Sequence, residues 1–198
     1  MGRKEGTVVL KNVVVNWAFI AEPDDEGLYR IQFEINKKSE DYALLIAEMQ
    51  KCMTSAGKSK GDITWWAGFK DHESNPDISL FNAKTRDEYK DKRTGETRKR
   101  ALPVFDVFAK QYAQGEVPRV ANGAICNVEV SPYFASFHNK FGIMLGLRSV
   151  QLMQFEIYSQ NPYSDESKNR APKAETEPTI SQNSAPQFVD ADDSDLPF

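Results

Sequence analysis

The sequence offers few side chains for thiol, metal or nucleophile chemistry. Among its 198 residues there are two cysteines, Cys52 and Cys126, and two histidines, His72 and His138. The cysteines lie far apart, one in a helix-like and one in a strand-like stretch, which favours free thiols in a reducing compartment over a disulfide. They form no spaced set with the histidines, so no zinc site is predicted.

Other catalytic and membrane signals are also missing. The chain has no phosphate-binding glycine loop, no nucleophile elbow and no pair of carboxylates that spacing brings together. We therefore expect a protein that is not an enzyme and needs no cofactor. No apolar run is long enough to cross a bilayer, and no apolar signal core follows the first residues, so we expect a cytoplasmic protein without membrane contact.

The charge is unevenly distributed along the chain. The formal net charge is −4, but residues 161–198 hold eight of the 29 acidic residues and only three of the 25 basic ones. Residues 1–160 are therefore close to neutral, and the overall acidity does not exclude a local basic surface that binds nucleic acid.

Alternating apolar residues predict several short strands. Residues 7–20 are rich in Val and aromatic side chains and predict one long strand, or two halves separated by a bulge. After a turn at 23–27, residues 28–35 alternate, with Tyr29 and Phe33 on the core face. Further strands are expected at 78–83, at 124–130 (ended by Ser131 and Pro132) and at 141–147, followed by a bulge near 148–149. This pattern favours a small closed barrel.

One helix is well indicated and a second region is ambiguous. Ser39 can cap a helix over 39–53, where apolar residues recur at helical spacing, and Ala56-Gly57 can end it. Residues 103–114 fit either a helix opened by Pro103 or a strand, because their branched and aromatic content suits both.

Two stretches carry candidate nucleic-acid contacts. Residues 58–76 are expected to form a loop whose tryptophans either stack on bases or close one end of the barrel as a hydrophobic cluster. Residues 84–100 hold eight basic and four acidic residues around Tyr89, and a turn at 93–96 can form a hairpin that contacts phosphates. The alternative for this stretch is a solvated loop. The stacking candidates are Trp65, Trp66 and Tyr89, with Trp17 a weaker one. The phosphate candidates are Lys84, Arg86, Lys92, Arg93, Arg98, Lys99 and Arg100.

The chain ends in a segment of different composition. Residues 161–188 are rich in Pro, Ser, Asn and Glu without periodicity, which predicts a disordered linker, so we divide the chain into a domain at 1–160 and a tail at 161–198. The last nine residues combine carboxylates with an apolar end, which suits capture by a partner better than a buried helix end, although a solvated terminus is the alternative. The residues concerned are Asp190, Asp192, Asp193, Asp195, Leu196, Pro197 and Phe198.

These motifs together resemble a known family. The tip is similar to the C-terminal tips of single-stranded DNA-binding proteins of bacteria and their phages, with Leu196 where Ile is more usual. Residues 78–84, 103–106, 122–128 and 142–151 resemble the OB-fold single-stranded DNA-binding proteins of tailed phages. The resemblance implies a mainly β fold, a five-stranded OB barrel with one or two helices, and a groove for single-stranded DNA. The helix at 39–53 departs from the usual pattern, because it follows the second strand rather than the third.

The resemblance also implies a function. We expect a protein that coats and protects single-stranded DNA during phage replication, recombination and repair, with little sequence preference, in the host cytoplasm. Its acidic tip would recruit a polymerase, a helicase/primase or a nuclease, and would compete with DNA for the basic surface. An RNA-binding OB protein and an adaptor that binds no nucleic acid remain alternatives, and a homodimer stays open.

Overall fold

The computed structural model describes residues 6–66, 70–91, 93–138 and 140–155, except for the side chains of Thr64, Trp65, Trp66 and Phe137. The predicted tail at 161–198 and the end of the predicted domain lie outside these residues. Within the part of the chain that is described, no helix is long and apolar enough to cross a membrane.

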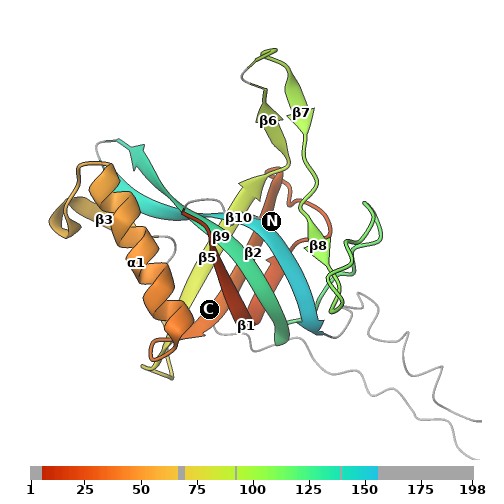
Figure 1. Ribbon diagram of the computed structural model, residues 1–198, viewed down its shortest axis with the longest axis horizontal. Helices are drawn as coiled ribbons and strands as arrows, with labels where there is room; N and C mark the ends of the chain where they lie inside the picture. Colours follow the sequence, from red (N-terminus) through yellow and green to blue (C-terminus); the bar gives the residue numbers. More distant parts are fainter. Residues whose placement is uncertain (1–5, 67–69, 92, 139, 156–198) are drawn as a thin grey trace, which may run out of the picture. The chain divides into compact units, whose positions relative to one another are not determined.

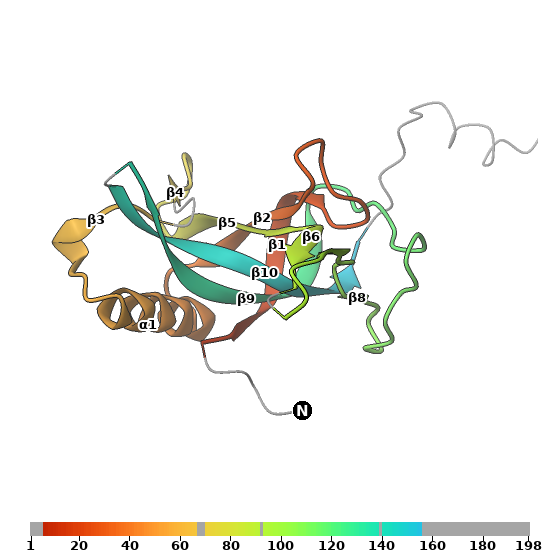
Figure 2. The same cartoon turned by 90° about the horizontal axis from the view of Figure 1, so that it is seen from above.

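Five strands close into a barrel (Figures 1 and 2). They are β1 (Val8–Phe19), β2 (Leu28–Asn36), β5 (Ile78–Arg86), β9 (Ala124–Phe137) and β10 (Lys140–Gln154). Going around the barrel, β1 pairs with β2, β2 with β5, β5 with β10, β10 with β9, and β9 with β1. The β5–β10 pairing is parallel and the other four are antiparallel, which is the OB topology that the sequence predicted.

Strand alternation fills the barrel interior. Ile31, Phe33 and Ile35 of β2 are at most 4% exposed, and the Phe33 ring stacks on Phe81 of β5 at a centroid distance of 6.1 Å. Burial of these apolar side chains is the main stabilising contribution, at about 1.5–3 kcal/mol for each large one. The assignment of Tyr29 and Phe33 to the core is confirmed, since they are 6% and 0% exposed.

Two predicted bulges are present. The β1–β2 register shifts between Val15 and Trp17, and the β9–β10 register shifts between Leu147 and Ser149. The predicted end of a strand at Ser131 and Pro132 is wrong, because β9 continues to Phe137. In the described residues β9 pairs with β1 only as far as Val130, so beyond it β9 has a neighbour on one side alone, where a proline is tolerated.

The helix α1 (Glu40–Ser55) agrees with the prediction. The Ser39 side chain accepts a hydrogen bond from the Tyr42 backbone N–H, and Glu40 and Asp41 occupy the positive end of the helix. Leu45, Met49 and Met53 are buried against the barrel. The helix lies between the second and third barrel strands, so it is an insertion relative to the usual OB pattern.

The ambiguous segment after Arg100 contains no helix. Its short strand β8 (Val104–Phe105) pairs in parallel with Val150 and Gln151 of β10. Val104 is buried, whereas Phe108 is 88% exposed, so the apparent helical spacing of these apolar residues does not define a packed face.

The connections between barrel strands carry the remaining elements. Between α1 and β5 lie the 3-10 helix η1 (Lys60–Asp62) and the strands β3 (Ile63–Trp66) and β4 (Lys70–Asp71). The predicted loop over 58–76 is therefore partly strand, because β3 pairs with the start of β10 and β4 with β5. Between β5 and β9 a separate hairpin forms from β6 (Glu88–Lys90) and β7 (Thr97–Lys99), as predicted.

Candidate nucleic-acid interface

The outer face of β1, β2 and β5 presents aromatic and cationic side chains side by side. Because Ile31 and Phe33 point into the barrel, Arg30 and Gln32 point outward. The register places Phe19 beside Arg30, and Arg30 beside Lys84. We call Phe19, Arg30 and Lys84 the cationic row.

A second row lies next to the cationic row. In the register Trp17 is beside Gln32, and Gln32 is beside Asn82. The Gln32 Nε2 donates a hydrogen bond of 3.0 Å to Asn82 Oδ1, so we call Trp17, Gln32 and Asn82 the amide row. The Trp17 and Phe19 rings connect the two rows in an edge-to-face contact with centroids 6.0 Å apart.

The β1 bulge explains why these rings face solvent. Val15 is buried at 0% exposure, and the extra residue at Asn16 brings Trp17 into register with the outward-facing Gln32. Phe19 follows two residues later on the same face and is 49% exposed. The half-buried Trp17 ring and the exposed Phe19 ring, both on a rigid strand, offer stacking surfaces at a small cost in side-chain entropy.

The turn between β1 and β2 holds Arg30 in place. Oδ2 of Asp24 lies 2.6 Å from Nε of Arg30, and Glu26 forms a second ion pair with the same guanidinium. Oδ1 of Asp24 accepts hydrogen bonds from the backbone N–H groups of Glu26 and Leu28, each at 3.0 Å. Ion pairs at a protein surface contribute at most about 1 kcal/mol, so a phosphate can replace Glu26 at little cost.

The β6–β7 hairpin continues this face beyond the end of β5 (Figure 1). Its root is tied to the β1–β2 turn, because the Asp87 N–H donates to the Gly27 carbonyl at 2.9 Å. The Arg100 guanidinium lies 5.1 Å from the centre of the Tyr89 ring and donates to Thr85 Oγ1 at 3.2 Å. Tyr89 is 40% exposed. The ring and the guanidinium therefore form a prepared stacking unit at the base of the hairpin.

Most of the predicted phosphate ligands lack carboxylate partners. Among the described residues, Arg98 is paired with Asp91 and Glu96, at 3.5 and 3.4 Å. In the same part of the chain, the following residues have no carboxylate oxygen within 4.0 Å: Lys84, Arg86, Arg93, Lys99 and Arg100. Lys92 lies outside the described residues. Four of these cations, Lys84, Arg86, Lys99 and Arg100, lie where β5 meets the base of the hairpin, and Arg93 lies in the hairpin turn, so this region stays the candidate phosphate-binding surface.

The structure separates the predicted stacking residues into two groups. Trp17 and Tyr89 lie on the face and hairpin just described. Trp65 and Trp66 belong to β3, in register with Gly142 and Ile143 of β10, and their side chains are outside what the structure describes. The acidic tip, from Asp190 to Phe198, is also outside the described residues.

The sequence interpretation missed Phe19 as a candidate and gave no role to Arg30, Gln32 and Asn82. Alternation in residues 28–35 already placed Arg30 and Gln32 on the outer face. Their proximity to Phe19 and Trp17 depends on the β1–β2 register, which the bulge shifts by one residue.

Comparison with known proteins identifies structures of the same fold. No protein-family model and no curated protein sequence matches this chain. The structure is similar to that of gp2.5, a single-stranded DNA-binding protein encoded by bacteriophage T7, with a TM-score of 0.65 and 21% sequence identity over 84% of this chain and 98% of that chain.

A second phage protein is also similar. The single-stranded DNA-binding protein from bacteriophage Enc34 gives a TM-score of 0.58 and 13% identity over 83% of this chain and 90% of that chain. Its complex with single-stranded DNA gives a TM-score of 0.56 and 12% identity, over 79% and 91% of the two chains. The predicted resemblance to phage proteins of this kind is thus confirmed at the level of the fold.

Proposed function

We propose that this protein binds single-stranded DNA along the outer face of β1, β2 and β5 and the β6–β7 hairpin. The observation that carries the proposal is that two solvent-facing rings, Trp17 and Phe19, share this face with Arg30 and lead toward a group of unpaired cations. The OB fold supports it, because the face of the second and third barrel strands is where OB barrels bind oligonucleotides. The similar Enc34 protein has been solved with single-stranded DNA.

Binding on this face requires no bond-making chemistry. Bases stack on the exposed rings, each stacked base contributing about 1–3 kcal/mol, with little dependence on sequence because every base has a π face. Lys84 and the hairpin cations neutralise phosphates and release counterions, so the affinity falls steeply as salt rises.

A salt-dependent titration tests this proposal. Labelled single-stranded DNA, double-stranded DNA and single-stranded RNA of equal length are titrated with the protein at several salt concentrations. We expect tightest binding to single-stranded DNA, with a linear fall of log affinity against log salt. Preference for RNA, read at the 2′-hydroxyl, would move the assignment to an RNA-binding OB protein. Absence of any salt-dependent binding would leave the adaptor alternative.

We also propose a role for the bound state and for the acidic tip. Sequence-independent coating of single-stranded DNA suits replication, recombination and repair, where such DNA is exposed. The tip at 190–198 joins four carboxylates to a Leu-Pro-Phe end, which fits a basic surface with a pocket for an aromatic ring. Its expected partners are a polymerase, a helicase/primase or a nuclease.

The tip proposal is tested with purified partners. Full-length protein and the Phe198→Ala variant are compared for binding to immobilised replicative polymerase and helicase/primase from the same host or phage. We expect the variant to lose most of the binding while its affinity for single-stranded DNA is unchanged. Equal binding of both forms to every partner tested would reject the docking role of the terminal ring.

A further inference from the structure

The amide row places two polar side chains in the middle of the proposed DNA surface. Gln32 of β2 and Asn82 of β5 are half-buried, and both point away from the barrel interior, which Phe33 and Phe81 fill. The Gln32 Nε2 donates a hydrogen bond to Asn82 Oδ1 at 3.0 Å. Among the described residues this is the one hydrogen bond that either side chain makes. The two amides therefore carry further polar groups that base stacking does not use.

One acceptor and one donor remain free on this pair. Each carboxamide has an acceptor oxygen and an NH₂ donor group. With Gln32 as the donor to Asn82, the Gln32 Oε1 and the Asn82 Nδ2 have no partner in the described part of the chain. Neither atom is among those that the barrel buries without a partner, so both are open to solvent. The pair thus presents an acceptor on β2 beside a donor on β5.

The order of these two groups can reverse. A half-turn of both amides about their last side-chain torsions makes Asn82 the donor and Gln32 the acceptor of the hydrogen bond between them. The free groups are then a donor on β2 and an acceptor on β5. Torsions of this kind are broad and roughly two-fold, so both orders keep the internal hydrogen bond at similar energy. No backbone movement is needed for the reversal.

The two orders match the edges of the four DNA bases. On the Watson–Crick edge of adenine and cytosine, an amino donor lies beside a ring-nitrogen acceptor. On that edge of guanine and thymine, a carbonyl acceptor lies beside a ring N–H donor. One order of the amide pair complements the first two bases and the reversed order complements the other two, so every base can form two hydrogen bonds. A donor and an acceptor in fixed order would favour half of the bases.

Charges on the neighbouring rows favour bases, rather than phosphates, over the amide row. Arg30 and Lys84 lie two residues away on one side, at about 6.6 Å along each strand. Two residues away on the other side, Glu34 of β2 carries a carboxylate on the same face, which disfavours a phosphate there. A strand whose phosphates follow the cationic row therefore has its bases over the amide row.

We propose that Gln32 and Asn82 form a reversible amide pair that hydrogen-bonds the Watson–Crick edge of the base stacked on Trp17, whichever base it is. The register supports this contact, because Trp17 is beside Gln32 and Gln32 is beside Asn82. Cross-strand neighbours lie about 4.5–5.5 Å apart, so the edge of a base on Trp17 reaches the pair. The inference rests on the proposed function and adds to it a polar base contact that selects no sequence.

Oligonucleotides of cytosine and of thymine test the pair. Both bases are pyrimidines, but cytosine has an amino donor where thymine has a carbonyl acceptor. Labelled oligo(dC) and oligo(dT) of equal length are titrated by fluorescence anisotropy at one fixed salt concentration, and the ratio of the two affinities is compared between variants. This comparison cancels differences in base stacking and strand flexibility, because they are the same for every variant.

Two substitutions of Gln32 should move this ratio in opposite directions. Gln32→Glu leaves acceptors toward the base, so the ratio should shift roughly fivefold toward oligo(dC). Gln32→Lys leaves donors toward the base, so the ratio should shift roughly fivefold toward oligo(dT). The double variant Gln32→Leu/Asn82→Leu removes the pair and should weaken both oligonucleotides by a similar factor, roughly tenfold. Far-UV circular dichroism checks that each variant is folded.

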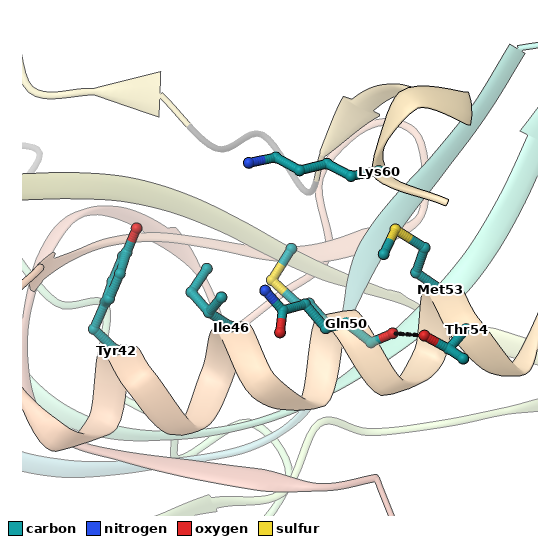
Figure 3. Close-up of a pocket in the computed structure, with 7 residues that line it drawn as sticks. Tyr42, Ile46, Gln50, Met53, Thr54 and Lys60 are labelled. Atoms are coloured by element: carbon teal, nitrogen blue, oxygen red, sulfur yellow. Dashed lines mark hydrogen bonds between the residues drawn. The ribbon is translucent and has the colours of Figure 1, made fainter. Parts of the chain in front are cut away.

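Gln50 provides the matched control. It is an exposed residue of α1, which belongs to none of the three strands of the face. Figure 3 shows Gln50 on the helix near Thr54, at the pocket that Lys60 lines from the opposite side. Gln50→Glu and Gln50→Lys make the same changes of charge at this distant position. They should leave the ratio of the two affinities at its wild-type value.

The outcomes separate this inference from the proposed function. A ratio that keeps its wild-type value in both Gln32 variants, or moves in the same direction in both, would overturn the amide pair and leave DNA binding standing. The same result would follow if the double variant lost affinity for neither oligonucleotide or for one alone. Equal shifts in the Gln50 variants would also overturn it, because they would show a general effect of charge. Failure of wild type to bind either oligonucleotide would reject the proposed function and this inference with it.

Discussion

At the scale of single residues, Trp17 and Phe19 are the side chains on which the proposed stacking depends. Their rings meet edge to face on the outer surface of β1, beside Arg30. We expect Trp17→Ala and Phe19→Ala each to weaken binding of single-stranded DNA by about 1–3 kcal/mol, or roughly fivefold to 150-fold, because each variant loses a stacked base. Fluorescence anisotropy of a labelled oligonucleotide at one fixed salt concentration measures the loss.

Two further variants serve as controls for this prediction. Trp17→Phe keeps a ring in the same position and should retain most of the affinity. Phe108→Ala removes a more exposed ring that belongs to none of the three strands of this face, and should leave single-site affinity unchanged. Wild-type affinity in both alanine variants of β1 would show that the outer face of β1 is not the DNA interface.

Single residues also show what the sequence could and could not predict. The apolar alternation around Tyr29 and Phe33 was sufficient to assign them to the core, because period-two burial is a local property of a strand. Phe19 was not recognised, because its neighbour Arg30 is reached only through the pairing of two strands and a bulge at Asn16. The register of a strand depends on its partner as well as on its own pattern.

The Cys126 thiol provides a pH-dependent test of the barrel core. Its side chain is 0% exposed, and burial raises the pKa of the thiol from 9.0 to about 12. In the unfolded chain the thiol ionises near its ordinary pKa, so the contribution to stability is complete below about pH 9 and is lost as the pH rises toward 12. We expect the free energy of unfolding, measured with urea, to fall across this interval.

The comparison variant for this measurement is Cys126→Ala. It lacks the ionisable group, so it should lose less stability over the same pH interval, although it starts from a lower value because of the cavity. The native thiol should also resist alkylation at pH 8 until the protein is unfolded. Rapid alkylation of Cys126 in the folded state would contradict its placement in the core.

At the scale of secondary-structure elements, we expect the β6–β7 hairpin to carry much of the salt dependence of the proposed DNA binding. Arg86 at the end of β5 and Lys99 in β7 have no carboxylate within 4.0 Å among the described residues, so each is available for a phosphate. For single strands each phosphate contact contributes about 0.7 to the slope of log affinity against log salt. The double variant Arg86→Gln/Lys99→Gln should therefore reduce the slope by about 1.4, measured in titrations at several salt concentrations.

A matched double variant removes the same charge elsewhere. Lys37 and Lys38, beyond the far end of β2, pair with Asp71 and Asp77 at 2.7 and 2.6 Å. Lys37→Gln/Lys38→Gln should leave the slope unchanged, because these lysines are already neutralised and lie away from the hairpin. An equal loss of slope in both double variants would indicate a general charge effect rather than phosphate contacts made by the hairpin.

Elements differ in how far their own sequence determines them. The hairpin was predicted because its turn and its charges are adjacent in the chain, and α1 because Ser39 and the apolar spacing lie within it. The continuation of β9 through Pro132 and the pairing of β3 with β10 were not predicted, because both depend on strands far away in the sequence. The segment after Arg100 forms a strand because it pairs with β10, which is far away in the sequence. The spacing of its own apolar residues also suited a helix.

At the scale of the whole molecule, the excess of acidic residues lies in the last part of the sequence, whereas the unpaired cations lie in the first part. Residues 1–160 are near neutral but concentrate unpaired cations at the hairpin, whereas residues 161–198 carry eight acidic and three basic residues. The OB topology was predictable as a class, since several short strands with bulges favour a closed barrel. The sequence placed the helix after the second barrel strand, as the structure does, but left open whether residues 103–114 form a second helix, and the structure has the short strand β8 there.

Removal of residues 190–198 tests whether the acidic tip competes with DNA for the cations. The deletion takes away four Asp side chains, which changes the formal net charge from −4 to 0. Screening extends to about 30 Å at 0.01 M salt but only about 10 Å at 0.1 M, so an electrostatic competitor acts mainly at low salt. We expect the truncated protein to bind single-stranded DNA several-fold more tightly at 0.01–0.02 M salt, with the difference disappearing above about 0.3 M.

Two substitutions separate competition with DNA from docking on a partner. Replacing the four aspartates with asparagine while keeping Leu196, Pro197 and Phe198 should reproduce the tighter DNA binding, because charge alone causes it. Phe198→Ala keeps the charge, so it should bind DNA like wild type and lose partner binding. If the truncated protein and wild type have equal affinity at low salt, the tip does not compete for the basic surface, and its carboxylates act only in docking.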